Sequence, residues 1–203
     1  MYSIRSGLVI AFHGCDQSVA QRVINGETML KSSSNKYDWL GPGAYFWENS
    51  PSRAFEFAEY LQQNPQISQG KIIKPAVIGA VIHLGFCLDL LDYGNLQLLK
   101  EGYNTLLAYN KISDLPQNKE VKGFEGLLLR DLDCAVIETL HALRDIYSQP
   151  PFDSIRGVFS EGEELYPNAG FREKDHIQIC VRNPNCIKGF FMPRVMNNDY
   201  PKI

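Results

Sequence analysis

The first candidates for chemistry are a histidine–glycine pair, His13 and Gly14, and a later tyrosine, Tyr45. The apolar, β-branched run at 7–12 predicts a buried strand with His13 and Gly14 at its exit. A glycine lets a flat ligand approach the backbone closely, so the N–H and C=O of Gly14 could pair with a carboxamide. Residues 41–46, Gly-Pro-Gly-Ala-Tyr-Phe, predict a tight turn and then an aromatic strand whose Tyr45 could stack on an aromatic ring.

The elements that must position these residues are short strands and helices. Ser50 and Pro51 predict a helix start, with Ser50 as N-cap, and the helix is expected to end near Asn64. A short helix is expected within 16–27, and strands are expected at 75–88, 154–159, 176–181 and 186–192. The middle of the chain, 95–149, predicts two longer helices, at 95–110 and 130–148, as an insertion or flank. This arrangement favours an α+β fold.

The ordered set of His13-Gly14, the glycine–aromatic segment 41–46 and the helix start at 50–54 resembles the ADP-ribosyltransferase superfamily. The similarity is to the branch of diphtheria toxin and the poly(ADP-ribose) polymerases, and it covers roughly residues 8–60. It implies a split β-sheet core and NAD as a substrate. It further implies that His13 holds the ribose, that the Gly14 backbone pairs with the nicotinamide amide, and that Tyr45 stacks on the nicotinamide ring. The implied cofactor-binding residues are His13, Gly14, Gly43, Tyr45, Ser50 and Arg53.

The family's third element is a glutamate on a late strand, and the candidate strand here is 176–181. Alternation directs Ile177, Ile179 and Val181 to the core, so we expect His176, Gln178 and Cys180 to look into the cleft. Gln178 is the best match, with His176 two residues earlier. Because no glutamate lies on this face, the resemblance implies single transfer or NAD cleavage rather than chain elongation. A loop carboxylate could replace it, and Glu161 is the first candidate, ahead of Glu163, Glu164 and Glu173.

Composition limits the class of protein. The chain has 203 residues, 44% hydrophobic and 21% charged, with a net charge of −3. It predicts one globular domain, 1–203, and argues against a wholesale electrostatic nucleic-acid binder. The apolar runs are far shorter than the ~20 residues that span a bilayer, and the N-terminus lacks a signal-peptide layout. Five widely spaced cysteines predict a reducing, cytoplasmic compartment and no metal-ligand set.

The element pattern predicts the α+β class, and the resemblance implies that the protein is an NAD-dependent mono-ADP-ribosyltransferase. We expect His13, Tyr45, Gln178, His176 and Glu161 to be its catalytic residues. The acceptor would be a protein or a nucleic acid, and the protein would be a toxin or defence effector with an antitoxin protein as partner. The alternatives are a non-catalytic NAD or ADP-ribose binding module, an NAD glycohydrolase, an interaction protein that docks a partner on the middle helices, and an RNA 2′-phosphotransferase.

Overall fold

The computed structural model describes residues 7–68, 70–120, 127–195 and 199. Its helices are α1 (Gln17–Ile24), α2 (Pro51–Gln63), α3 (Pro65–Ser68), α4 (Tyr93–Tyr109) and α5 (Asp131–Ile146). Its strands are β1 (Val9–Asp16), β2 (Ala44–Glu48), β3 (Pro75–Ile82), β4 (Cys87–Asp89), β5 (Asn118–Glu120), β6 (Leu127–Arg130), β7 (Ser154–Phe159), β8 (His176–Val181) and β9 (Ile187–Phe191). Short 3-10 helices lie at Ile112–Asp114 and Pro184–Cys186.

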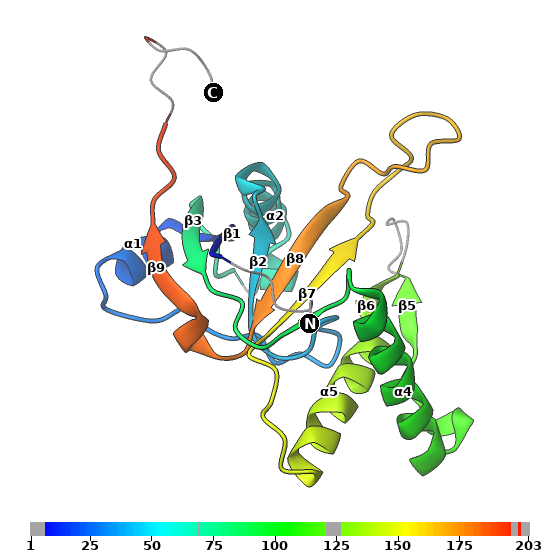
Figure 1. The fold of residues 1–203 in the computed structure, drawn as a ribbon. Coiled ribbons are helices and arrows are strands. Elements are labelled where there is room, and N and C mark those ends of the chain that lie inside the picture. The colour runs from blue at the N-terminus through cyan, green and yellow to red at the C-terminus, as the bar shows by residue number, and fades with distance from the viewer. Residues whose placement is uncertain (1–6, 69, 121–126, 196–198, 200–203) are drawn as a thin grey trace.

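Seven of these strands form one mixed sheet, in the order β4-β7-β8-β2-β1-β3-β9. All neighbours are antiparallel except β4 and β7, which are parallel. Figure 1 shows β9, β3 and β1 in one half of the sheet and β2, β8 and β7 in the other half. The remaining strands, β5 and β6, form a separate two-stranded sheet beside α4 and α5. The expected α+β class is therefore confirmed.

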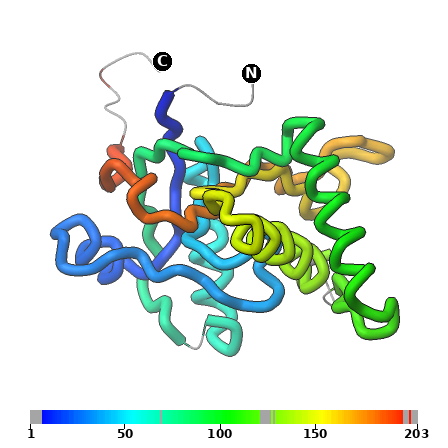
Figure 2. Tube along the Cα trace, turned by 60° about the horizontal axis from the view of Figure 1, so that its bottom comes forward, coloured from blue at the N-terminus to red at the C-terminus, as the bar shows by residue number. Residues whose placement is uncertain are grey.

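The sheet has two covered faces. On the face that we call the α2 face, α2 packs on β1 and β3, and α5 packs over β4, β7 and β8 through Leu88, Ile137 and Ile155. On the opposite face, the α1 face, α1 and the following segment cover a core that includes Ala11, Phe46 and Ile179. Helix α4 packs mainly against α5, and the 160–175 segment projects away from the body of the molecule (Figures 1 and 2).

The predicted elements are largely confirmed, with some boundaries wrong. Helix α2 begins at Pro51, and the backbone N–H of Asn64 closes it on the Tyr60 carbonyl. Ser50 holds the N-cap position without a side-chain capping bond. The first strand does not exit at His13. It continues to Asp16, because β3 pairs with it along its whole length. In the described part of the chain, every helix is too short or too polar to cross a bilayer.

Two other expectations about elements are corrected. The predicted strand 75–88 is two strands, because the chain turns at Gly85, which has a φ of +65°. The sequence predicts that the side of β8 with His176, Gln178 and Cys180 faces the cleft. In the structure this side of β8 is buried, because α5 and the residues around Trp39 cover it. The opposite side of β8 is buried by residues of the α1 face.

Candidate functional site

The sheet opens between β1 and β2 after a short stretch of pairing. The two strands pair at Ala11 with Glu48 and at Phe12 with Trp47, and the N–H of Asn49 donates to the carbonyl of Ile10 over 3.0 Å. In an antiparallel ladder, alternate residues direct their backbone groups to the same neighbour. The N–H and C=O of Gly14 therefore point toward β2, beyond the last pair. We call this gap between Gly14 and Tyr45 the split.

The pairing of β1 with β3, on its other edge, supports this assignment. The N–H of Gln17 donates to the carbonyl of Lys74 over 2.8 Å, in line with the β1–β3 pairing. Odd-numbered residues of β1 thus direct their backbone groups to β3, and even-numbered ones direct them to β2. Gly14 belongs to the second set.

His13 bridges the split with its side chain. Its Nδ1 lies 2.7 Å from the Tyr45 carbonyl oxygen, the atom that the N–H of Gly14 would bond if the ladder continued. Because a carbonyl only accepts, Nδ1 carries the proton, and Nε2 keeps its lone pair. Burial lowers the pKa of His13, which favours this neutral form. Position 13 thus presents a hydrogen-bond acceptor beside the backbone edge of Gly14.

Tyr45 lies next to the split, but its hydroxyl is already engaged. The hydroxyl accepts the N–H of Leu40 at 3.0 Å and donates to the carbonyl of Gly41 at 2.8 Å. The ring packs among residues that include Leu40 and Cys180, and burial raises the tyrosine pKa far above its ordinary value. Tyr45 therefore stabilises the turn that precedes β2. Gly41 lies in this turn and has a φ of +76°.

The two glycines of the predicted site are tightly covered. A Cβ on Gly14 would collide with the Ala54 carbonyl of α2, so only the in-plane edge of Gly14 is open toward the split. A Cβ on Gly43 would collide with the sulfur of Cys180 and the carbonyl of Val181. Gly43 lets β2 approach β8 closely.

Three of the predicted residues, Arg53, His176 and Gln178, gather with Trp47 on the α2 face. Trp47, Arg53, His176 and Gln178 form what we call the buried polar cluster. Trp47, His176 and Gln178 are 4%, 9% and 5% exposed, and the Arg53 side chain is 14% exposed. The buried atoms Trp47 Nε1, Arg53 Nε, His176 Nε2 and Gln178 Oε1 have no hydrogen-bond partner among the described residues.

The buried polar cluster has aromatic walls and a charged cover. The ring of His176 lies 6.1 Å from that of Trp47, 6.3 Å from Trp39 and 5.9 Å from Phe159. Its Nδ1 is 2.6 Å from the Lys174 carbonyl, so its unpartnered Nε2 is an acceptor. Burial lowers the pKa of His176, which again favours the neutral ring.

The charged cover over the cluster comes from the two ends of the projecting 160–175 segment. Glu161, 13% exposed, accepts a hydrogen bond from Arg53 Nη2 at 2.5 Å, and Lys174 pairs with Glu56 of α2 at 2.7 Å. These two ion pairs fasten the base of the segment to α2. The structure thus brings Arg53, Glu161, His176 and Gln178 together, as a site on this face would need.

The two groups of residues are linked by Trp47. Trp47 pairs with Phe12 on one side and with Gln178 on the other, and it lies two residues along β2 from Tyr45. At the strand rise this separates the split from the cluster by about 7 Å along β2. His13 lies on the α1 face, since its neighbours Ala11 and Cys15 pack there, whereas the cluster lies on the α2 face. The predicted residues therefore form two adjacent groups instead of one cleft.

The sequence interpretation missed several residues that shape the cluster. Trp47 could have been found, because strand alternation places it on the same side as Tyr45. Arg130 stacks over Trp39 at 4.6 Å and over Phe159 at 5.1 Å, and no local pattern signals that contact.

Arg156 is buried and pairs with two carboxylates, neither of which is that of nearby Asp153. Its Nε lies 2.6 Å from Glu48 and its Nη1 3.1 Å from Asp89, with the arginine side chain 3% exposed. Hydrogen bonds and charge from these carboxylates outweigh burial and raise the pKa of Arg156. Asp153 instead accepts from the Phe86 N–H and from Asn183.

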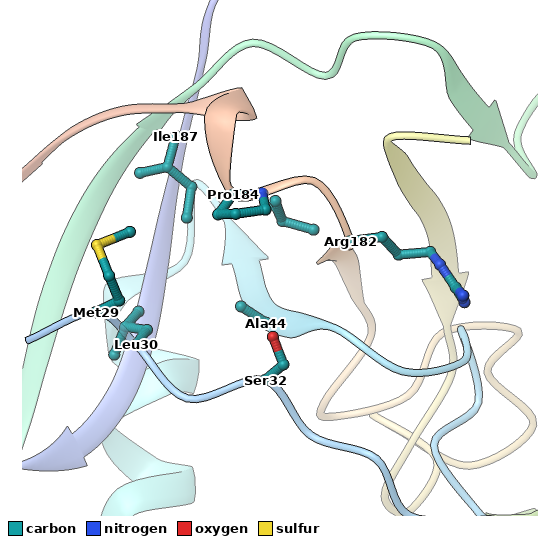
Figure 3. Close-up of a pocket in the computed structure, with 8 residues that line it drawn as sticks. Met29, Leu30, Ser32, Ala44, Arg182, Pro184 and Ile187 are labelled. Carbon is teal, nitrogen blue, oxygen red and sulfur yellow. The ribbon is translucent and has the colours of Figure 1, made fainter. Parts of the chain in front are cut away.

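A pocket opens on the α1 face at the start of β2 (Figure 3). Figure 3 shows side chains from the 29–32 segment on one side and from the chain after β8 on the other. Its floor includes Ala44, the residue before Tyr45. Its lining residues are Met29, Leu30, Ser32, Ala44, Val181, Arg182, Pro184 and Ile187. The pocket is mostly apolar and contains none of the predicted site residues.

Comparison with known proteins adds no relative. No protein-family model, curated protein or solved structure matches the chain.

Proposed function

We propose that the protein is an NAD-dependent mono-ADP-ribosyltransferase with an ADP-ribosyltransferase-like split sheet, and that it binds nicotinamide at the split. Support comes from the placement of the three segments that carry the resemblance. The His-Gly segment, the glycine–aromatic segment and the late strand become β1, β2 and β8, which are neighbours in the sheet although they are distant in sequence. The helix start that follows the second segment becomes α2.

The observation that carries the proposal is the free backbone edge of Gly14. Its N–H and C=O face the split, and an amide offers the complementary C=O and N–H. In this pose the Nε2 of His13 would accept a hydrogen bond from a ribose hydroxyl. The expected stacking by Tyr45 becomes a positioning role, because its hydroxyl holds the turn before β2.

The reaction would break the bond between nicotinamide and C1′ of the ribose. The bonding electron pair leaves with nicotinamide, which departs as a neutral molecule, and an acceptor nucleophile forms the new bond to C1′ while losing a proton to a base. The enzyme's contribution would be positioning and electrostatic support. Glu161 would supply the carboxylate that the late strand lacks, and it is held in an ion pair with Arg53.

The acceptor would be a protein side chain or a nucleic-acid group, and a toxin or defence role follows from the resemblance. A toxin of this kind would act in the cytoplasm and be held by an antitoxin protein. On this proposal, expression of the wild-type chain inhibits cell growth, and the variant His13→Ala relieves the inhibition.

The test is nicotinamide release from NAD by the purified protein in the presence of cell extract. We expect wild-type release, and a loss of about 100-fold in His13→Ala, because a misplaced ribose loses reactive geometry. The matched control is His83→Ala, which removes an exposed histidine just after the end of β3 and should leave the rate unchanged. No release by the wild type would overturn the proposal. Binding of NAD without any release would favour the non-catalytic module.

A further inference from the structure

The buried polar cluster has a balanced set of unused hydrogen-bonding atoms. Trp47 Nε1–H and Arg53 Nε–H are two donors, and His176 Nε2 and Gln178 Oε1 are two acceptors. Each buried polar group left without a partner destabilises the fold, so four in one place call for a ligand that pairs with them.

The surroundings of these atoms define the shape and charge of that ligand. Aromatic rings of Trp39, Trp47 and Phe159 stand around His176, which suits a flat ring. The guanidinium groups of Arg53 and Arg130 lie over these rings, at 5.8 Å from Trp47 and 4.6 Å from Trp39. Two cations disfavour a positively charged ring such as the pyridinium of NAD. The ligand should therefore be flat and uncharged.

We infer that the buried polar cluster is a binding site for an uncharged, amino-substituted nitrogen heterocycle of the adenine type. The amino group of adenine donates two hydrogen bonds, which His176 Nε2 and Gln178 Oε1 would accept. The ring nitrogens on either side accept two, which Trp47 Nε1–H and Arg53 Nε–H would donate. The heterocycle could be the adenine end of NAD or that of a separate nucleotide. The inference goes beyond the proposed reaction and does not depend on turnover.

Access to the cluster would require the 160–175 segment to move. The segment is fastened to α2 by the Arg53–Glu161 and Lys174–Glu56 ion pairs, and these lie at its base. Separating the Arg53–Glu161 pair would uncover the cluster.

The test uses tryptophan fluorescence, because both tryptophans of the chain line the cluster. The wild-type protein is titrated with adenosine and, separately, with inosine. We expect a saturable change with adenosine and binding at least tenfold weaker with inosine. Inosine has a carbonyl in place of the amino group and a proton on N1, so it would leave both acceptors unpaired and set its N1–H against a donor. The absence of a saturable change, or equal binding of the two nucleosides, would overturn the inference.

A variant gives an independent readout. Gln178→Leu should weaken adenosine binding roughly tenfold by removing one acceptor, and Gln97→Leu on the exposed side of α4 should not change it. Unchanged binding by Gln178→Leu would contradict the inference. If Gln178→Leu fails to fold, the comparison of adenosine with inosine on the wild type still decides.

Addition of NAD distinguishes the source of the ring. Displacement of adenosine by NAD would place the adenine end of NAD in the cluster. Continued nicotinamide release with adenosine bound would indicate a separate nucleotide. Adenosine binding without nicotinamide release would overturn the proposed reaction alone, and release without adenosine binding would overturn this subsite alone.

Discussion

At the scale of single residues, Asp16 joins three parts of the chain. One carboxylate oxygen accepts the N–H and hydroxyl of Ser18 at 2.9 and 2.6 Å and thereby caps α1. The other accepts the N–H groups of Ile73 and Lys74 at 2.8 and 2.9 Å, just before β3. The hydrogen bonds from Lys74 and Ser18 hold the pKa of Asp16 well below its usual range. Asp16 thus fixes the end of the strand that carries His13 and Gly14.

Asp16→Ala should lower the free energy of unfolding by about 2 kcal/mol at pH 7. Because the folded pKa is depressed, the ionised carboxylate stabilises the fold fully above the ordinary aspartate value of about 3.9. This stabilisation disappears as the pH falls through the folded value, so the difference between wild type and variant should shrink in acid. Urea unfolding at several pH values measures it.

The control is Asp114→Ala, in an exposed 3-10 turn, which should cost little at any pH. A wild-type-to-variant difference for Asp16 that stays constant down to low pH would contradict the assigned role.

Residue types predicted part of the site but not its arrangement. His13 and Gly14 were recognisable because a histidine followed by a glycine is a local signal. The engagement of the Tyr45 hydroxyl was not, since its partners are the backbone groups of a turn. The buried polar cluster depends on β8 and α2 meeting at Trp47, a long-range contact that no spacing encodes.

At the scale of elements, close contact between β2 and β8 is what joins the two halves of the candidate site. Gly43→Ala would place a methyl against the Cys180 sulfur and the Val181 carbonyl. We expect destabilisation by about 1–3 kcal/mol, the usual effect of overpacking. Gly170→Ala, where a Cβ would meet nothing, is the matched control in thermal or urea unfolding. Equal stability of the two variants would mean that the approach of β2 to β8 is looser than described.

The 160–175 segment gives a second prediction at this scale. Glu161→Gln removes the charge that fastens the segment to Arg53, so amide hydrogen exchange within 160–175 should become faster. Glu163→Gln, two residues away and exposed, should leave exchange unchanged. Exchange in Glu161→Gln that matches the wild type would show that the ion pair does not hold the segment.

Most elements were predictable because their patterns are local. Helix α2 has its proline start and apolar stripe, and β8 alternates in sequence. The two-stranded sheet of β5 and β6 was missed because, in the described part of the chain, these short strands pair with each other and not with the main sheet. The burial of both faces of β8 was also missed, because it depends on α5 covering one of them.

At the scale of the whole molecule, the fold class follows from the sequence and the position of the site does not. Mixed short strands and helices predicted an α+β fold, and the seven-stranded sheet confirms it. The middle helices were expected as an insertion or flank, and α4 and α5 pack together at one end of the sheet (Figure 1). The split, by contrast, exists because β1 pairs with β3 along its full length but pairs with β2 at only two residue positions.

The central claim is that nicotinamide pairs with the backbone edge of Gly14 at the split. The most direct measurement is the amide proton and nitrogen resonance of Gly14 in the isotope-labelled protein during a titration with nicotinamide. We predict a saturable shift at Gly14, with Gly170 on the projecting segment unchanged. A Gly14 resonance that stays in place while nicotinamide binds elsewhere, or does not bind, would contradict the account.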